Sequence, residues 1–153
     1  MKLKIYIDGA SRGNPGLGAA GVVIMDTHGA VIAETGKFLG SCTNNFAEYS
    51  AFSLAFSLAK KAGGTELQIF SDSELLVRQF NGIYRIKNPN LASFMAEIRK
   101  KTSSFKAVTL GHIPRELNAR ADMQANIALD RGSGKVRRKK GGDSGKPSQL
   151  SFF

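Results

Sequence analysis

The sequence predicts an α/β protein built on a five-stranded mixed sheet, with helices packed on the sheet. Two observations support this fold class. Three short apolar runs joined by turns open the chain, between residues 2 and 40, and they are typical of an antiparallel meander. From residue 44 onward, stretches with helical spacing alternate with two further strand-like runs. The expected element order is β-β-β-α-β-α-α-β-α.

Length and composition restrict the classes of protein to consider. The 153 residues, 42% of them hydrophobic, suffice for one domain with a core. No apolar run is long enough to span a membrane, and the N-terminus lacks a signal-peptide core. Cys42 is the only cysteine, which excludes an internal disulfide and fits a reducing compartment. We therefore expect a cytoplasmic protein without membrane association, and nothing in the sequence demands more than a monomer.

The charge balance points to a polyanionic partner. The formal net charge is +10, from 22 basic and 12 acidic side chains. Residues 132–153 carry six of the basic side chains and one acid, so the rest of the chain is itself basic. This balance is typical of proteins that bind nucleic acid, although a solvated basic surface would look the same.

The first strand begins at the N-terminus, where Leu3, Ile5 and Ile7 alternate with polar side chains. It runs straight into Asp8, and we expect a glycine-rich loop containing Pro15 to follow. A carboxylate at the end of a strand is held rigidly, which suits a metal ligand. The alternative is that the dipeptide Asp8-Gly9 is simply a turn.

The remaining elements follow from changes in apolar spacing. Asn44 or Asn45 can cap the first helix, and Ser71 can cap the second. We predict strands over 18–26 and 30–40, a helix over 44–62, a strand over 66–71, helices over 72–80 and 90–103, a strand over 106–112, and a helix over 117–131.

Composition shifts sharply at residue 132, where glycine, serine and lysine come to dominate. Hydrophobic residues that could build a core are scarce until the last residues. We predict a folded domain over 1–131 and a basic flexible tail over 132–153, with a linker over 132–148.

Four carboxylates lie on separate elements of the predicted fold. Asp8 ends the first strand, and Glu48 lies in the first turn of the long helix on its apolar, sheet-facing side. Asp72 lies at the junction of the fourth strand and the next helix, and Asp122 lies on the last helix. Each has a simpler interpretation, as a turn residue, a capping-box or first-turn acid, or an exposed helix acid.

Adjacent strand ends and inward helix faces would instead bring all four acids together. A buried cluster of that charge needs cations. Oxygen ligands without cysteine or paired histidine favour Mg²⁺ or Mn²⁺. Two such ions, roughly 3.5–4 Å apart in known sites, perform in-line hydrolysis of phosphodiesters. Four acids in a basic body therefore predict a metal-dependent nuclease.

Four segments give the chain a family resemblance. They read YIDGASRGNPG (6–16), TNNFAEY (43–49), IFSDSEL (69–75) and GHIPRELNARAD (111–122). In this order and spacing they resemble type 1 ribonuclease H, which cuts the RNA strand of RNA/DNA hybrids. The resemblance covers residues 1–131 and implies the ribonuclease H-like fold.

The resemblance implies a role for each acid and for one histidine. Asp8, Glu48, Asp72 and Asp122 match the family's metal-binding catalytic acids, which act with two ions and leave 3′-hydroxyl and 5′-phosphate ends. His112 matches the family's mobile histidine, which assists proton transfer or product release. A strand-end histidine with a satisfied hydrogen bond is the alternative.

Polar residues around the acids match the family's contacts with the hybrid. These are Asn14, Thr43, Asn44 and Asn45, with Thr43 and Asn44 matching the pocket for a DNA phosphate. Amides suit minor-groove edges and 2′-hydroxyls. Asn44 and Asn45 would serve equally well as helix caps. Glu74 lies where some members carry a glutamine, but an acid there would repel phosphate, so it receives no role.

The resemblance also marks a departure from longer family members. Only residues 81–89 span the gap where those members insert a basic helix-and-loop handle, so the chain resembles a short form. The basic segment VRRKK, residues 136–140, would replace the handle through phosphate contacts or serve only as solubilising charge.

The last five residues are similar to the bacterial sliding-clamp-binding motif, with Phe152 in place of leucine. They are Gln149, Leu150, Ser151, Phe152 and Phe153. Tethering to a sliding clamp would suit an enzyme that removes RNA primers. The alternatives are that the phenylalanines fold back onto the domain, or that the match is accidental.

The sequence thus predicts a metal-dependent endonuclease that hydrolyses the RNA strand of RNA/DNA hybrids, with a role in RNA primer or R-loop removal. Two alternatives stay open. One is a nucleic-acid-binding adaptor with an inactive site, tethered by its tail. The other is a nuclease of the same fold that also cuts double-stranded RNA.

Overall fold

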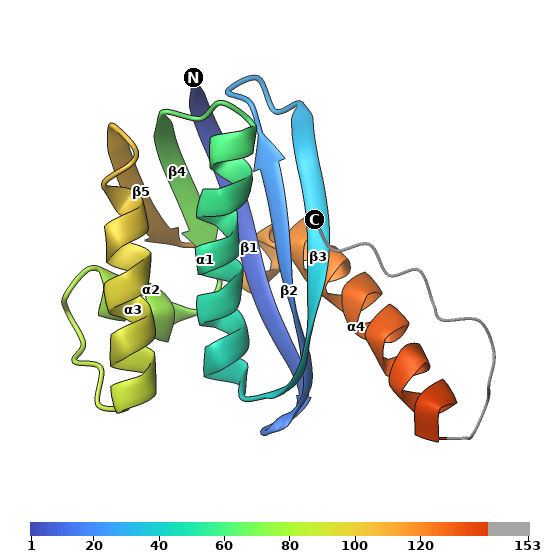
Figure 1. Cartoon of the computed structure of the whole chain (residues 1–153). Coiled ribbons are helices and arrows are strands. Elements are labelled where there is room, and N and C mark those ends of the chain that lie inside the picture. Colours follow the sequence, from blue (N-terminus) through green and yellow to red (C-terminus); the bar gives the residue numbers. More distant parts are fainter. Residues whose placement is uncertain (141–153) are drawn as a thin grey trace.

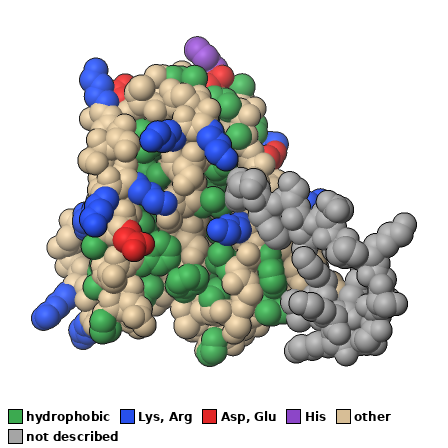
Figure 2. All heavy atoms as spheres, viewed as in Figure 1, with side chains coloured by type: hydrophobic (Ala, Val, Ile, Leu, Met, Phe, Trp, Pro, Cys, Tyr) green, Lys and Arg blue, Asp and Glu red, His purple; other side chains and the backbone are tan. Residues whose placement is uncertain are grey.

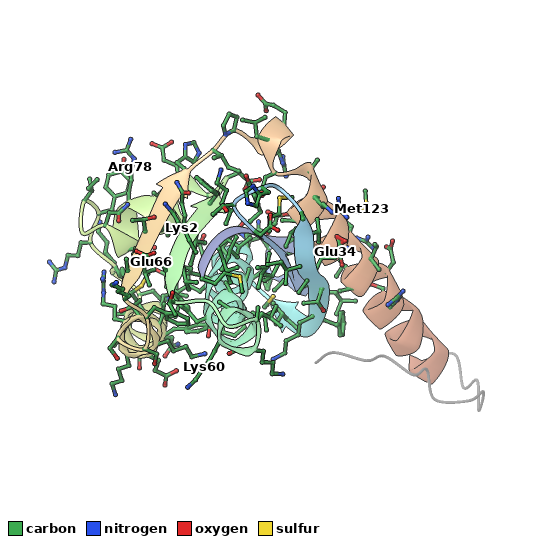
Figure 3. All side chains as sticks on the ribbon, turned by 90° about the horizontal axis from the view of Figure 1, so that it is seen from above. Lys2, Glu34, Lys60, Glu66, Arg78 and Met123 are labelled. Carbon is green, nitrogen blue, oxygen red and sulfur yellow. The ribbon has the colours of Figure 1, made fainter. Side chains whose placement is uncertain are left out.

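The computed structural model describes residues 1–140 and shows one sheet with helices on both faces (Figure 1). The strand order is β3-β2-β1-β4-β5. Seen from above, α1 and α3 lie on one side of the sheet and the start of α4 lies on the other (Figure 3). Within the described residues, no helix combines the length and the apolar character needed to cross a membrane.

The order of the elements is the predicted one. Strands β1, β2 and β3 form the antiparallel meander, whereas β4 pairs in parallel with β1 and β5, which confirms the mixed sheet. The elements are β1 (Lys2–Gly13), β2 (Gly16–Met25), β3 (Val31–Cys42), α1 (Asn44–Lys61), β4 (Glu66–Ser71), α2 (Glu74–Phe80), α3 (Pro89–Thr102), β5 (Ala107–His112), a 3₁₀ turn (Arg115–Leu117) and α4 (Ala119–Lys140).

The main core lies between the sheet and α1. The alternating residues Leu3, Ile5 and Ile7 of β1 are fully buried, as the period-two pattern predicts. Phe52 and Phe56 of α1 are buried opposite them, with their ring centroids 5.1 Å apart. This packing fixes α1 against β1, and it therefore also fixes the acid that α1 carries.

Asp8 lies inside β1, so the expectation that it ends the strand is wrong. Strand β1 continues to Gly13, paired with β2 in a hairpin whose turn is Asn14–Pro15. The predicted glycine loop is strand because its small residues pair closely with those of β2. On the other edge of β1, β4 ends at Ser71, opposite Ile7. Asp8 is therefore the first residue of β1 without a strand beside it on that edge.

The helix caps also differ from the prediction. Thr43, in extended conformation, caps α1 and accepts a hydrogen bond from the Phe46 N–H, so neither Asn44 nor Asn45 is the cap. Glu48 consequently lies in the second turn. Ser73 rather than Ser71 caps α2, because the chain bends at Asp72 and Ser73 is the last extended residue before the helix.

Helix α4 continues to Lys140, so the predicted linker is wrong over residues 132–140. The reason is packing: Gly132 and Ser133 are buried, and a Cβ atom at Gly132 would lie 2.1 Å from the ring of Phe38. Glycine lets α4 approach β3 this closely. Residues 141–153, including the predicted partner-binding residues 149–153, lie outside the described part of the chain.

Candidate active site

A polar cleft of about 420 Å³ brings the four predicted acids together. Strand β1 contributes Asp8, helix α1 contributes Glu48, and the first turn of α4 contributes Asp122. Asp72 comes from the short link between β4 and α2. The cleft thus forms where β4 ends beside β1 and two helices on opposite faces of the sheet meet that edge.

The carboxylates are close enough to share a cation. One oxygen from each of Asp8, Glu48 and Asp72 lies within 4.8 Å of the others. Asp122 is not in this tight group, but its carboxyl group interacts with that of Asp8. Asp8 is buried, whereas Glu48 and Asp72 are half-buried. The fourth acid therefore stands beside a compact group of three.

Burial and mutual repulsion disfavour the charged forms of two of these acids. Burial, followed by the charges of Glu48 and Asp72, raises the pKa of Asp8 to about 9. Burial, followed by the charge of Asp72, raises the pKa of Glu48 to about 8. Such acids retain protons at neutral pH unless a cation stabilises their ionised forms. Hard oxygen donors within reach of one another fit Mg²⁺ or Mn²⁺.

The backbone of β1 holds Glu48 in place. The Gly9 N–H donates a hydrogen bond to Glu48 Oε2 at 3.3 Å. A Cβ atom at Gly9 would lie 2.3 Å from the backbone of Ala47 and Glu48, which is too close for any side chain. Glycine at this position is thus what allows α1 to bring Glu48 to the strand.

Asn118 connects the elements that carry the acids, and sequence reasoning missed it. Its Nδ2 group donates to the Ile7 carbonyl at 2.8 Å and to Asp72 Oδ2 at 3.3 Å. The backbone carbonyl of Asn118 accepts a hydrogen bond from the Asp122 N–H at 3.1 Å. The side chain is buried, and Oδ1 has no partner among the described residues. Its place four residues before Asp122 in GHIPRELNARAD was the available signal.

Arg115 is a second residue that the sequence analysis missed. It lines the acid cleft, and its charge lowers the pKa of Glu48 against the larger effect of burial. Among the cleft-lining residues of the described chain it is the one with a cationic side chain. A guanidinium at this place is suited to meet a phosphate.

His112 lies at the same end of the sheet as the acids but does not line the cleft. It is the last residue of β5 and is in register with Ser71, the residue before Asp72. Its side chain is exposed. The structure therefore places it at the end of β5, beside the end of β4 that leads to Asp72, and its predicted catalytic role stays a prediction.

The predicted nucleic-acid contacts surround a second groove, which we call the amide groove. It has a volume of about 500 Å³ and shares Asn45 with the acid cleft. Asn14 accepts a hydrogen bond from the Asn44 N–H at 3.0 Å, and Asn44 lines the acid cleft. The amide groove is lined by Asn14, Ser41, Cys42, Thr43, Asn45, Phe46, Asn88, Asn90 and Leu91.

The amide groove contains two residues that were not predicted, Asn88 and Asn90. Asn88 caps α3, and its side chain accepts from the Asn90 and Leu91 N–H groups. Neither acidic nor basic side chains line the groove within the described chain. Glu74, which received no predicted role, forms an ion pair with Arg78 at 2.7 Å. It lines neither the acid cleft nor the amide groove.

Comparisons with known proteins agree with this geometry. The reverse transcriptase-like family matches residues 6–128. A ribonuclease H of Clostridium botulinum is 34% identical, with 84% of this chain and 96% of that protein covered. The chain belongs to the ribonuclease H family.

Solved type 1 relatives share the fold. The ribonuclease H1 of Halobacterium salinarum superposes with a TM-score of 0.83 at 38% identity, covering 85% of this chain and 98% of that chain. LC11 ribonuclease H1, solved in complex with an RNA/DNA hybrid, superposes with a TM-score of 0.82 at 39% identity. The match covers 86% of this chain and 99% of that chain. The chain spans 65% of the curated ribonuclease HI of Halobacterium salinarum, and 36% of a bifunctional protein of Mycobacterium tuberculosis to which it is 37% identical.

Proposed function

We propose that this protein is a metal-dependent endonuclease that hydrolyses the RNA strand of RNA/DNA hybrids. The observation that carries the proposal is the cleft in which four carboxylates converge and which opens into the amide groove. Membership of the ribonuclease H family supports it, as does the relative solved with a hybrid.

The four acids would hold divalent cations, Mg²⁺ or Mn²⁺, and we propose two ions per site. When bound, such ions supply an activated water and stabilise the leaving oxygen of a phosphodiester. The protein's own groups prepare the site: Asn118 orients Asp72, and the Gly9 N–H holds Glu48. His112, at the end of β5, would assist proton transfer or product release.

The amide groove would bind the hybrid beside the cut site. Asn44 and Asn45 line the acid cleft, while Asn14 and Thr43 line the amide groove. Neutral amides and hydroxyls suit the 2′-hydroxyls and minor-groove edges of the hybrid. The negative charges of the acids, by themselves, would repel a phosphate of the substrate. Arg115 would offset that repulsion at the cleft.

Several finer features belong to the same proposal. Eight residues between α2 and α3 replace the basic handle of longer members, so we propose a short-form enzyme. We also propose that it acts as a monomer in the cytoplasm on RNA primers or R-loops. Residues 149–153 would bind a bacterial sliding clamp, and a pull-down of purified clamp by the full chain and by a chain truncated at residue 148 would test this.

A substrate panel tests the proposed activity. One labelled sequence is presented as RNA/DNA hybrid, double-stranded RNA, double-stranded DNA and single-stranded RNA, each with Mg²⁺, Mn²⁺ or EDTA. We expect metal-dependent cutting of the RNA in the hybrid, leaving 3′-hydroxyl and 5′-phosphate ends. Hybrid binding without cutting in either metal would favour the adaptor, and equal cutting of double-stranded RNA would favour the broader nuclease.

A further inference from the structure

A further groove, distinct from the acid cleft and the amide groove, lies on the outer face of α1, and the proposed catalytic site does not use it. We call it the lysine–serine groove. Its volume is about 290 Å³, and α1 lies between α3 and β3 at this face (Figure 1). It is lined by Lys37, Leu39, Phe46, Ser50, Ser53, Leu54, Ser57, Phe94 and Lys101.

Hydroxyl groups and ammonium groups converge in this groove. Ser50, Ser53 and Ser57 follow one another at helical spacing on α1. Lys101 of α3 donates a hydrogen bond to Ser53 Oγ at 2.8 Å, and Lys37 approaches from β3. Hydroxyls and ammonium groups are donors suited to phosphate oxygens.

The two lysines are not neutralised by carboxylates. The ion pairs within the described part of the chain involve other basic residues, all arginines. Among the described residues, no acid lines either this groove or the amide groove. Figure 2, viewed as Figure 1, shows Lys and Arg side chains spread over this face, where acidic side chains are sparse.

The lysine–serine groove continues the amide groove. Phe46, whose exposed fraction is 41%, lines both. Along β3, Lys37 and Leu39 belong to the lysine–serine groove and Ser41 belongs to the amide groove. Along α3, Leu91 belongs to the amide groove and Lys101 to the lysine–serine groove. A continuous path thus runs from the acid cleft through the amide groove to the two lysines.

We propose that the lysine–serine groove binds backbone phosphates of one strand of the hybrid, beyond the part held at the cut site. This inference rests on the proposed function and names an additional contact of the same substrate. Lys37 and Lys101 supply charge and the serines supply neutral donors, while the exposed ring of Phe46 packs against sugar or base. The groove thereby gives the short-form enzyme a basic grip outside its α2–α3 link.

The size of α1 sets the length of strand involved. Ser57 lies nine residues beyond Glu48 on α1, which is about 14 Å along a helix that rises about 1.5 Å per residue. At about 3.4 Å per nucleotide, this distance corresponds to about four nucleotides. Hybrids that end closer to the cut site should therefore not extend along the whole groove.

The test measures how KM depends on hybrid length. Hybrids with one defined cut site are extended in steps on one side and then on the other, for the wild type and for the double variant Lys37→Ala/Lys101→Ala. We expect KM of the wild type to fall as one side lengthens by about four base pairs. For the long hybrid, the variant should raise KM about 3- to 10-fold, leave kcat unchanged and reduce the salt dependence.

The control Lys2→Ala/Lys106→Ala removes the same charge from exposed lysines at the opposite end of the sheet. An equal rise in KM for this control, or a rise in the test variant that is the same at every hybrid length, would overturn the inference. Oligo-glutamate is a second probe. If it binds the wild type but not the test variant, while KM keeps its dependence on length, the groove serves an acidic protein partner instead. If the wild type cuts none of the hybrids, the result contradicts the proposed function rather than this inference.

Discussion

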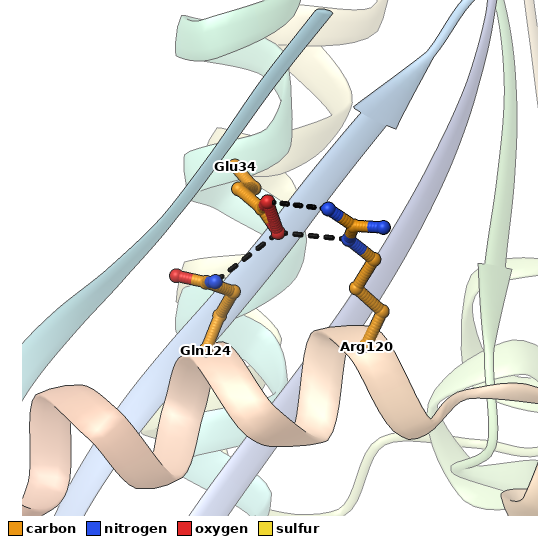
Figure 4. Close-up of polar contacts among 3 residues, drawn as sticks. All are labelled: Glu34, Arg120 and Gln124. Atoms are coloured by element: carbon orange, nitrogen blue, oxygen red, sulfur yellow. Dashed lines mark hydrogen bonds and ion pairs between the residues drawn. The ribbon is translucent and has the colours of Figure 1, made fainter. Parts of the chain in front are cut away.

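The molecule contains two carboxylate sites with opposite electrostatics: the four acids of the cleft, and Glu34 with its partners Arg120 and Gln124. In the acid cleft, burial and neighbouring acids raise the pKa of Asp8 and of Glu48. Between β3 and α4, Glu34 accepts two hydrogen bonds from Arg120, at 2.8 and 2.9 Å, and one from Gln124 at 3.2 Å (Figure 4). These partners, chiefly the hydrogen bond from Arg120, lower the pKa of Glu34.

This difference in electrostatics indicates that the acid cleft needs a bound cation, whereas the Glu34 site is already neutralised by the protein. Glu34 has its counter-charge within the protein, and the pair connects β3 to α4 near the surface. The acids of the cleft repel one another, and Arg115 only partly offsets this for Glu48. Folding maintains this unfavourable arrangement through the packing of α1, α4 and β1. We infer that its stabilisation comes from cations supplied by solution.

Neutralising an acid of the cleft should have the largest effect. Asp72→Asn keeps the shape of the side chain but removes a metal ligand, so the rate of hybrid cleavage should fall at least about 1000-fold. The melting temperature without metal should stay the same or rise, because a like charge is removed. Cleavage rate and thermal melting of one preparation measure both, and near-normal cleavage would contradict the proposed site.

The metal-free protein should become less stable as pH rises. For Asp8 and Glu48 the folded-state pKa is above the unfolded one, near 4, so the folded state binds more protons between about pH 4 and pH 9. Stability is thus greatest at the acidic side of this window and is lost as pH rises through the raised pKa values. Melting in EDTA from pH 5.5 to 9 checks this.

Mg²⁺ should reverse that trend, because it binds the ionised acids of the folded state. The rise in melting temperature on adding Mg²⁺ should therefore grow with pH. Glu34→Gln is the matched control, and its response to Mg²⁺ should equal that of the wild type. A Mg²⁺ effect that does not change with pH would speak against titrating ligands in the cleft.

Removing the side-chain amide of Asn118 should have an intermediate effect. Asn118→Ala loses the hydrogen bonds to Ile7 and to Asp72 and leaves the Ile7 carbonyl without its amide donor. We expect a loss of about 1–3 kcal/mol in the free energy of unfolding and a higher Mg²⁺ requirement for cleavage. Asn81→Ala, which removes a side-chain amide that donates to the Leu110 carbonyl and lies outside the acid cleft, is the control. Equal Mg²⁺ requirements in both variants would exclude a positioning role.

Disrupting the Glu34 site should have the smallest effect. Glu34→Gln weakens the contacts with Arg120 and should lower the melting temperature slightly at pH 7, with no change in cleavage. Since the pKa of Glu34 is lowered by folding, its contribution exists above the unfolded value and disappears as pH falls through the folded one. The difference in melting temperature between variant and wild type should therefore vanish in acid.

Much of the fold could be predicted because local patterns agreed with it. Alternation in β1 and helical spacing in α1 were sufficient to place both elements, and β4 has the predicted bounds. The predictions were wrong where tertiary packing, rather than the local sequence pattern, determines the conformation of the chain. The glycines after Asp8 suggested a loop but pair with β2, and those after Arg131 suggested a linker but let α4 pack on Phe38.

The acids of the site could be predicted, whereas the residues that position them could not. Acids in four coordinated motifs carry a chemical signal, so Asp8 and its partners were identified without a structure. Asn118 and Gly9 act through a buried hydrogen bond and a close backbone approach. Such roles depend on what lies across the fold: the motif around Asp122 marks the place of Asn118 but does not show its partners.

Binding of Mn²⁺ by the cleft tests the central claim most directly, because it does not depend on cleavage. Free Mn²⁺ is measured by electron paramagnetic resonance during titration of the wild type, Asp72→Asn and Glu34→Gln at pH 8. We expect the wild type and Glu34→Gln to bind alike, and Asp72→Asn to bind at least about 10-fold more weakly. Equal affinity in all three proteins would contradict the claim that the four acids form one metal-binding catalytic site.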